Sequence, residues 1–95
     1  MSDYSLEEIS KYIGGEFYGS DKLVSGFSID SRTIENNDVF ICIKGENYDG
    51  HNFIQDVLPK VACVITSYDI DNIDLSKQSY IKVNDTFEAL QKMSA

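Results

Sequence analysis

Two short polar segments of the chain carry residue types that bind small polar ligands. The first, Asp30-Ser31-Arg32, places a carboxylate, a hydroxyl and a guanidinium next to one another. The Ser31 hydroxyl can donate to or accept from a uracil or sugar edge, and Arg32 offers a planar fork for a diphosphate or a carboxylate. The alternative is an ion pair between Asp30 and Arg32 within the segment, which needs no ligand.

The second segment, residues 45–51, is polar and contains two glycines. Gly45 and Gly50 allow its backbone to approach a ligand closely, because neither has a side chain. Between them, Tyr48 offers an aromatic face on which a base can stack. The residue types of the two segments together suit a nucleotide better than a protein partner.

Some of these residues also have purely structural explanations. Asp49 is a favoured residue for a helix N-cap, and His51, the single histidine, more often serves as a structural hydrogen-bond donor than as a ligand. Asp30, Asp49 and His51 match the spacing of no standard metal motif, so we expect no metal site. The sequence shows no nucleophile–base pair, so no residue is predicted to be catalytic.

Length and composition restrict the class of protein. A chain of 95 residues is one domain or a fragment of something larger. Its hydrophobic fraction of 42% fits an ordinary globular chain rather than a disordered one. No apolar run approaches the roughly 20 residues of a membrane span, and the first residues lack the features of a signal peptide. We therefore expect a cytoplasmic protein without a membrane partner.

Charge and cysteine usage narrow the possible partners. The chain has 16 acidic and 8 basic residues, a net charge of -8, which disfavours nucleic acid as a partner because nucleic-acid binding needs a basic face. A single nucleotide is still compatible, since one loop of backbone N–H groups and one Arg or Lys can hold its phosphates. Cys42 and Cys63 lie in apolar runs, where we expect buried reduced thiols. A disulfide is the alternative if their strands are neighbours.

Hydrophobic periodicity predicts an α/β fold, a small mixed sheet with a βαβ unit and flanking helices. Helices are predicted near 5–13, 52–58 and 85–93. The first begins with a capping box, in which Ser5 and Glu8 bond to each other's backbone, and Pro59 ends the second. The third carries the apolar residues Phe87, Leu90 and Met93.

Strands are predicted over 16–18, 23–29, 39–43, 61–66 and 79–83. The runs 39–43 and 61–66 are apolar without alternation, which is typical of strands covered on both faces in a parallel sheet. With the helix between them they form the βαβ unit. Residues 67–78 are polar without a period and are predicted to form a surface connection.

The predicted strands place the two polar segments. Each segment leaves the carboxyl end of a strand, and ligands bind outside the carboxyl ends of strands in open parallel sheets. If the two strands are neighbours, the segments form one site.

The motifs that carry these residues resemble a known family. The stretch Ser28-Ile29-Asp30-Ser31-Arg32-Thr33-Ile34, followed by residues 38–54 with Asp49-Gly50-His51, is similar to the N-terminal domain of the Mur ligases. That family has D-S-R, a turn, G-D-x-F-x-A-x-x-G and then D-G-H-x-F. The pair of motifs is specific, although each alone is weak. Residues 9–19 and 83–90 resemble the branch that adds D-alanyl-D-alanine, the MurF branch.

The resemblance implies a role and a set of contacts. Residues 1–95 would be the domain that binds the UDP end of UDP-N-acetylmuramoyl-peptide in peptidoglycan precursor synthesis, with the ATP-binding and C-terminal domains absent from the chain. The implied substrate contacts are Ile29, Ser31, Glu46, Asn47 and Tyr48, with Arg32 as a weaker candidate for the ligand's polar end. The implied loop support comes from Asp30, Gly45, Asp49, Gly50 and His51.

The resemblance also implies that the chain alone is inactive. ATP and magnesium belong to the parent enzyme, and we expect no cofactor in this domain. None of the six glycines is followed by Lys-Ser or Lys-Thr, so the chain has no G-x-x-x-x-G-K-[ST] loop for ATP. Two alternatives stay open: a domain of the tripeptide-forming MurE branch, and a free-standing nucleotide-binding or interaction domain.

Overall fold

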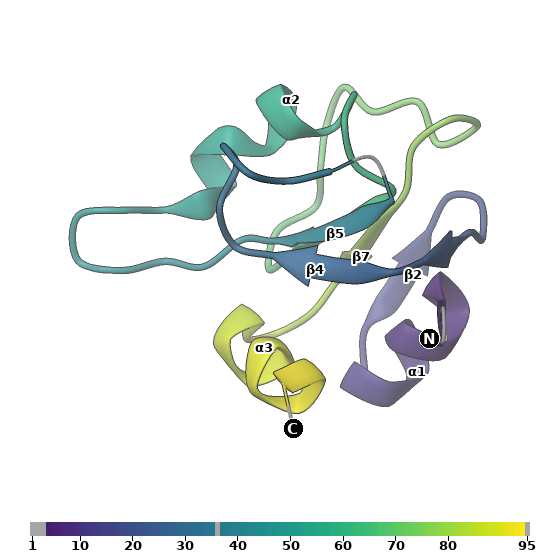
Figure 1. The fold of residues 1–95 in the computed structure, drawn as a ribbon, viewed down its shortest axis with the longest axis horizontal. Helices are drawn as coiled ribbons and strands as arrows, with labels where there is room; N and C mark the ends of the chain where they lie inside the picture. The colour runs from purple at the N-terminus through teal and green to yellow at the C-terminus, as the bar shows by residue number, and fades with distance from the viewer. Residues whose placement is uncertain (1–3, 36, 95) are drawn as a thin grey trace.

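The computed structural model describes residues 4–35 and 37–94 and shows a five-stranded mixed sheet with helices on both faces (Figure 1). The elements are β1 (Tyr4–Ser5), α1 (Leu6–Ile13), β2 (Glu16–Tyr18), β3 (Leu23–Val24), β4 (Gly26–Ser28), β5 (Asp38–Ile41), the 3-10 helix η1 (Gly50–Phe53), α2 (Ile54–Val57), β6 (Cys63–Thr66), β7 (Tyr80–Lys82) and α3 (Thr86–Ser94). In this part of the chain no helix is long and apolar enough to cross a membrane.

The sheet has the order β2-β7-β6-β5-β4, in which only β2 runs antiparallel to its neighbour. β1 and β3 form a separate two-stranded ladder. In Figure 1, α2 lies above the sheet and α1 and α3 lie below it. This arrangement confirms the predicted mixed sheet and its βαβ unit, with Val39 of β5 opposite Cys63 of β6 in parallel register.

Side chains of the central strands alternate between two buried clusters. In β5, Val39 and Ile41 belong to the cluster under α1 and α3, whereas Phe40 belongs to the cluster under α2. β6 divides in the same way, with Ile65 on the first side and Val64 on the second. Because both faces are covered, every residue in the middle of these strands is apolar, which explains the absence of alternation in the sequence.

The helices begin where local chemistry predicts. Ser5 Oγ accepts from the N–H of Glu8 at 3.1 Å, and Glu8 Oε1 accepts from the N–H of Ser5 at 3.1 Å. Gly14 ends α1 in the left-handed region, with φ of 72°. The second helix starts earlier than predicted, at Gly50, because Asp49 caps η1 by accepting from the N–H of His51.

Three details of the expected elements differ in the structure. Residues 23–29 form two strands rather than one, because β3 pairs with β1 and β4 pairs with β5 on either side of Ser25. The connection 67–78 contributes to the core through Ile70, which is buried in the cluster under α2. On α3, Phe87 is exposed while Met93 packs against the core.

The two cysteines are free and buried on opposite faces of the sheet. Cys63 belongs to the cluster under α1 and α3, and Cys42 to the cluster under α2. Neighbouring strands alone therefore do not allow a disulfide, since the side chains point apart. The expected buried, reduced thiols are therefore confirmed.

Candidate functional site

The carboxyl ends of β4, β5 and β6 lie at one edge of the sheet, because the three strands are parallel neighbours. The segments 29–32 and 45–51 leave this edge, and the loop after β5 projects beyond it (Figure 1). The hydroxyl of Tyr48 donates to the carbonyl of Ile29 at 3.1 Å. The structure therefore brings the two predicted segments together. We refer to them, with Ser67 after β6, as the carboxyl edge.

Asp30 organises the first segment. Its carboxylate accepts from the backbone N–H of Arg32 at 2.9 Å, and from Nε and Nη2 of the same residue at 3.1 Å each. The side-chain hydrogen bond from Arg32 is the main reason that the pKa of Asp30 is lowered. The intraloop ion pair is thus present, although the Arg32 side chain is 87% exposed. A phosphate would have to share this guanidinium with Asp30.

The remaining candidates of the first segment are accessible. Ile29 is exposed, and Ser31 is half-buried at the start of the turn that the N–H of Thr33 closes on the carbonyl of Asp30 at 3.3 Å. Neither residue is fully buried, so the structure leaves both partly accessible to solvent.

The second segment is a narrow lobe with a fixed base. Lys44 and Asp49 form an antiparallel bridge, and the N–H of Gly45 donates to the carbonyl of Tyr48 at 2.6 Å. At the base, the N–H of Gly50 donates to the carbonyl of Ile43 at 2.8 Å. A Cβ on Gly50 would lie 2.9 Å from the backbone nitrogen of Ile43, so this close approach requires glycine. The predicted contacts Glu46 and Asn47 are exposed at the tip.

Tyr48 is held from two sides. Its ring stacks on Phe53 with centroids 5.6 Å apart and an interplanar angle of 25°. Partial burial, with a further contribution from the Asp30 carboxylate, raises the pKa of the Tyr48 hydroxyl, which therefore stays protonated and donates to Ile29. Since Phe53 stacks on one side of the ring, a base would have to stack on the other side. The residue as a whole is 41% exposed.

Asp49 and His51 have structural roles. Asp49 Oδ1 accepts from the backbone N–H of His51 at 2.9 Å and lies 2.6 Å from its Nδ1. Burial raises the pKa of Asp49, but the hydrogen bonds from His51 outweigh that effect and the net shift is downward. The other ring nitrogen, Nε2, accepts from the backbone N–H of Ser67 at 3.1 Å and lies 3.0 Å from Ser67 Oγ.

Ser67 is the residue that sequence reasoning missed. With His51 and Asp49 it has the order and distances of a hydrolytic Ser-His-Asp triad, the nucleophile–base pair that the sequence did not show. Two observations favour a structural role instead. The Nε2 lone pair is shared with the Ser67 N–H, and the His51 side chain is 7% exposed with the ring of Tyr68 against it, centroids 4.4 Å apart.

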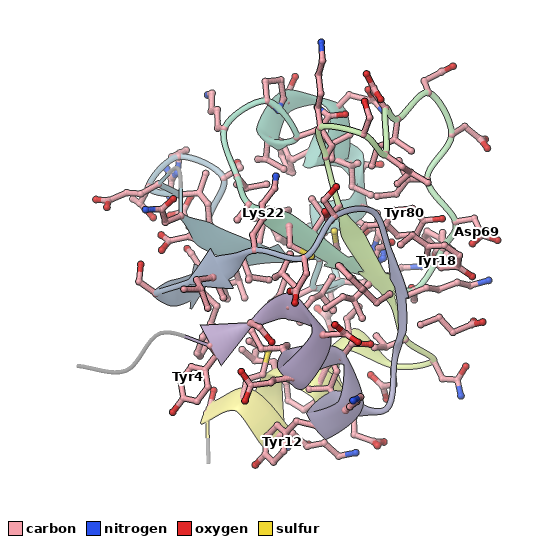
Figure 2. All side chains as sticks on the ribbon, turned by 90° about the vertical axis from the view of Figure 1, so that its right-hand side faces the viewer. Tyr4, Tyr12, Tyr18, Lys22, Asp69 and Tyr80 are labelled. Atoms are coloured by element: carbon pink, nitrogen blue, oxygen red, sulfur yellow. The ribbon has the colours of Figure 1, made fainter. Side chains whose placement is uncertain are left out.

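The described residues form two cavities away from these loops. The larger, about 550 Å³, is an apolar groove between α1, α3 and the start of β4. Figure 2 shows Tyr4 and Tyr12 on this side, beside α3. At the carboxyl edge, the side chains of Arg32, Glu46, Asn47 and Tyr48 are exposed.

Metal binding finds no support at the carboxyl edge. Across the described residues, no group of three or more His, Cys, Asp or Glu side chains is placed to hold a metal ion. Both ring nitrogens of His51 are engaged by Asp49 and Ser67. The segments hold three carboxylates, Asp30, Glu46 and Asp49, and one arginine, Arg32, with Lys44 just before the second segment.

Comparison with known proteins assigns the family. A family model described as "Mur ligase family, catalytic domain" matches residues 23–95, more than half of the chain. The chain belongs to the Mur ligase family. A UDP-N-acetylmuramoyl-L-alanyl-D-glutamate–2,6-diaminopimelate ligase of Phocaeicola vulgatus is 35% identical over 91 residues, 94% of this Mur ligase chain and 19% of the relative.

Relatives of a second type also match. A UDP-N-acetylmuramoyl-tripeptide–D-alanyl-D-alanine ligase of Rickettsia prowazekii is 45% identical over 65 residues, 67% of this chain and 14% of that protein. The chain therefore spans less than a fifth of the length of these two relatives. The sequence expectation of the Mur ligase family is confirmed, while both branches are represented among its relatives.

Solved structures support the fold. MurF from Acinetobacter baumannii superposes with a TM-score of 0.81 at 24% identity, over 97% of this chain and 20% of that one. MurF from Thermotoga maritima, solved in complex with ADP, superposes with a TM-score of 0.63 at 26% identity, over 75% of this chain and 16% of that one. The mixed sheet with its helices is the fold of the Mur ligase N-terminal domain.

Proposed function

We propose that residues 1–95 bind the uridine end of UDP-N-acetylmuramoyl-peptide as the N-terminal domain of an ATP-dependent peptidoglycan-precursor ligase. The observation that carries the proposal is the convergence of 29–32 and 45–51 at the carboxyl edge, joined by the Tyr48–Ile29 hydrogen bond. Both segments follow parallel strands, where open sheets bind ligands. The nucleoside would contact Ile29 and Ser31 from one side and Glu46, Asn47 and Tyr48 from the other.

The electrostatics favour recognition of the nucleoside over the phosphates. Arg32 is paired with Asp30, and the three carboxylates of the segments outnumber Arg32 and the flanking Lys44. A dianionic diphosphate therefore gains little from this domain alone. We infer that the affinity of this domain for the nucleotide is weak. In a parent protein as long as the relatives, the ATP-binding and C-terminal domains would supply the remaining contacts.

We propose the D-alanyl-D-alanine-adding branch for the parent enzyme. Residues 9–19 and 83–90 resemble that branch, and the A. baumannii MurF likeness extends over 97% of the chain. The diaminopimelate-adding relative at 35% identity over 94% of the chain favours the MurE branch as the second candidate. The dipeptide or amino acid that the full-length ligase accepts in a phosphate-release assay distinguishes the two.

A calorimetric titration tests the proposed function. UDP-N-acetylmuramoyl-tripeptide and UDP are expected to bind, and the free tripeptide is not, because the predicted contacts all face the uridine. Binding of the free tripeptide with no binding of UDP would contradict the proposal. With ATP, magnesium and D-alanyl-D-alanine present, the 95-residue chain is expected to release no phosphate, since it lacks a loop for ATP.

A further inference from the structure

Hydrogen bonds link the ends of β4, β5 and β6, three of the four parallel strands, at the carboxyl edge. After β6, Ser67 donates its N–H to Nε2 of His51. His51 Nδ1 lies 2.6 Å from Asp49 Oδ1. The next residue back, Tyr48, reaches across to the carbonyl of Ile29 after β4. A continuous chain of contacts thus crosses the sheet from β6 to β4.

The contacts assign the tautomer of His51. Because a backbone N–H can only donate, the Nε2 that faces the Ser67 N–H must carry a lone pair. The ring proton of the neutral imidazole is then on Nδ1, where it donates to the Asp49 carboxylate. Asp49 Oδ1 also accepts the backbone N–H of His51, so it fixes both the ring and the start of η1.

We propose that His51 is a positioning residue. It holds the loop 45–48 in the position that a uridine ligand requires. This inference rests on the proposed function. The tip of the lobe is held to itself by the short Gly45–Tyr48 bond, and to the rest of the sheet by Tyr48 and by its base at Asp49 and Gly50. Loss of the His51 ring releases the Asp49 carboxylate, and the adjacent Tyr48 is expected to shift with it while the Lys44–Asp49 bridge remains.

Side-chain replacement separates positioning from bulk packing. His51→Phe keeps a ring of similar size but removes the donor and the acceptor. The Ser67 N–H and the Asp49 carboxylate then lose their hydrogen bonds to the imidazole. His51→Gln keeps one donor and one acceptor. The matched control is Asn52→Ala, at the exposed neighbouring position of the same helical turn.

Three measurements on the 95-residue chain test the proposal. A long-range ¹H–¹⁵N spectrum of the imidazole is expected to show the proton on Nδ1. In His51→Phe, the amide signals of 46–48 should shift while those of α1 stay unchanged, and UDP affinity should fall roughly tenfold. His51→Gln should retain UDP affinity within about threefold of the original chain, and Asn52→Ala should match it.

The outcomes decide between the inference and its alternatives. A proton on Nε2, or unchanged 46–48 amides in His51→Phe, would overturn the positioning role whether or not UDP binds. If the original chain binds no UDP while the tautomer and the loop shifts are as expected, the proposed function fails. The positioning of the loop by His51 then still holds. If His51→Phe does not fold, the tautomer and His51→Gln still decide. A proton on Nδ1 with UDP affinity kept within about threefold supports the proposal, whereas a loss of about tenfold in His51→Gln contradicts it. Covalent labelling of Ser67 by a fluorophosphonate would also overturn it, because that requires a free nucleophile.

Discussion

The carboxyl edge has the polar groups of a binding site, whereas the apolar groove has the concave shape of one. At the edge, hydroxyl, carboxylate and guanidinium groups converge from two loops, but they form an open surface. The groove has a volume of about 550 Å³, but aromatic and aliphatic side chains such as Tyr12, Phe27 and Met93 make up much of its lining. A concave shape alone therefore does not identify the site that recognises a polar ligand.

The difference has a physical consequence for affinity. An open polar surface exchanges hydrogen bonds to water for hydrogen bonds to a ligand, and each exchange has a small net free energy. A single such domain therefore binds weakly, and enclosure by further protein would strengthen the same contacts. In the proposed ligase, further domains would supply this enclosure for the exposed polar groups of the carboxyl edge.

The two thiols lie in the clusters on opposite faces of the sheet, and their labelling has the largest expected effect. Burial raises the pKa of Cys42 to about 12, and it also raises that of Cys63. At pH 8 roughly one Cys42 in ten thousand is a thiolate. Both thiols should react with a disulfide reagent at least about a thousandfold more slowly in the native protein than in urea. Fast labelling of Cys42 alone would show that the carboxyl edge opens freely.

Glycine substitutions probe the base of the lobe against its tip. Gly50→Ala should lower the free energy of unfolding by about 1–3 kcal/mol, because the new Cβ meets backbone atoms of Cys42 and Ile43. Gly45→Ala is the matched control, since its Cβ would make ordinary contact at 3.8 Å with the carbonyl of Tyr48. Urea denaturation of the two variants measures the difference, and equal losses would refute the close approach at Gly50.

Acid titration tests the contribution of the Asp49 carboxylate, which contacts His51 at the carboxyl edge. The pKa of Asp49 is lowered in the folded state, so its carboxylate contributes stability above the unfolded pKa of about 3.9, and this contribution is lost as pH falls through the folded value. Asp49→Asn should cost about 1 kcal/mol at pH 7 and progressively less below about pH 4. Urea midpoints of both proteins between pH 7 and pH 2.5 check this. A difference that grows on acidification has the wrong sign for the account.

The smallest effects compare single side chains in the two regions. Ser31→Ala should weaken UDP binding by about 0.5–1.5 kcal/mol, the value of one neutral hydrogen bond. Tyr12→Ala, in the groove and 62% exposed, should leave UDP binding unchanged. Calorimetric titration measures both. The opposite ranking would place the nucleotide in the groove.

Features set by neighbouring residues could be predicted from the sequence. The capping box of Ser5 and Glu8 and the left-handed Gly14 involve positions a few residues apart, and the structure has both. The parallel pairing of β5 with β6 followed from apolar runs on either side of a short helix. Because carboxyl ends of parallel neighbours share an edge, the meeting of 29–32 with 45–51 could be anticipated as well.

Features that depend on the packing of distant residues could not be predicted. The Ser67–His51 contact joins positions 16 residues apart and depends on where β6 ends relative to β5. Ser67 is an ordinary serine at the start of a polar stretch, so its type gave no signal. The break at Ser25 arises because β3 and β4 have different partners, which no local pattern encodes.

Mapping of the amide chemical shifts during titration with UDP-N-acetylmuramoyl-tripeptide tests the central claim most directly, because it reports every region at once. The account predicts that the amides of 29–32 and 45–51 shift with a common saturation curve, while α1 and the groove residues Tyr12 and Phe27 do not respond. Shifts confined to 67–78, or centred on the groove, would contradict it.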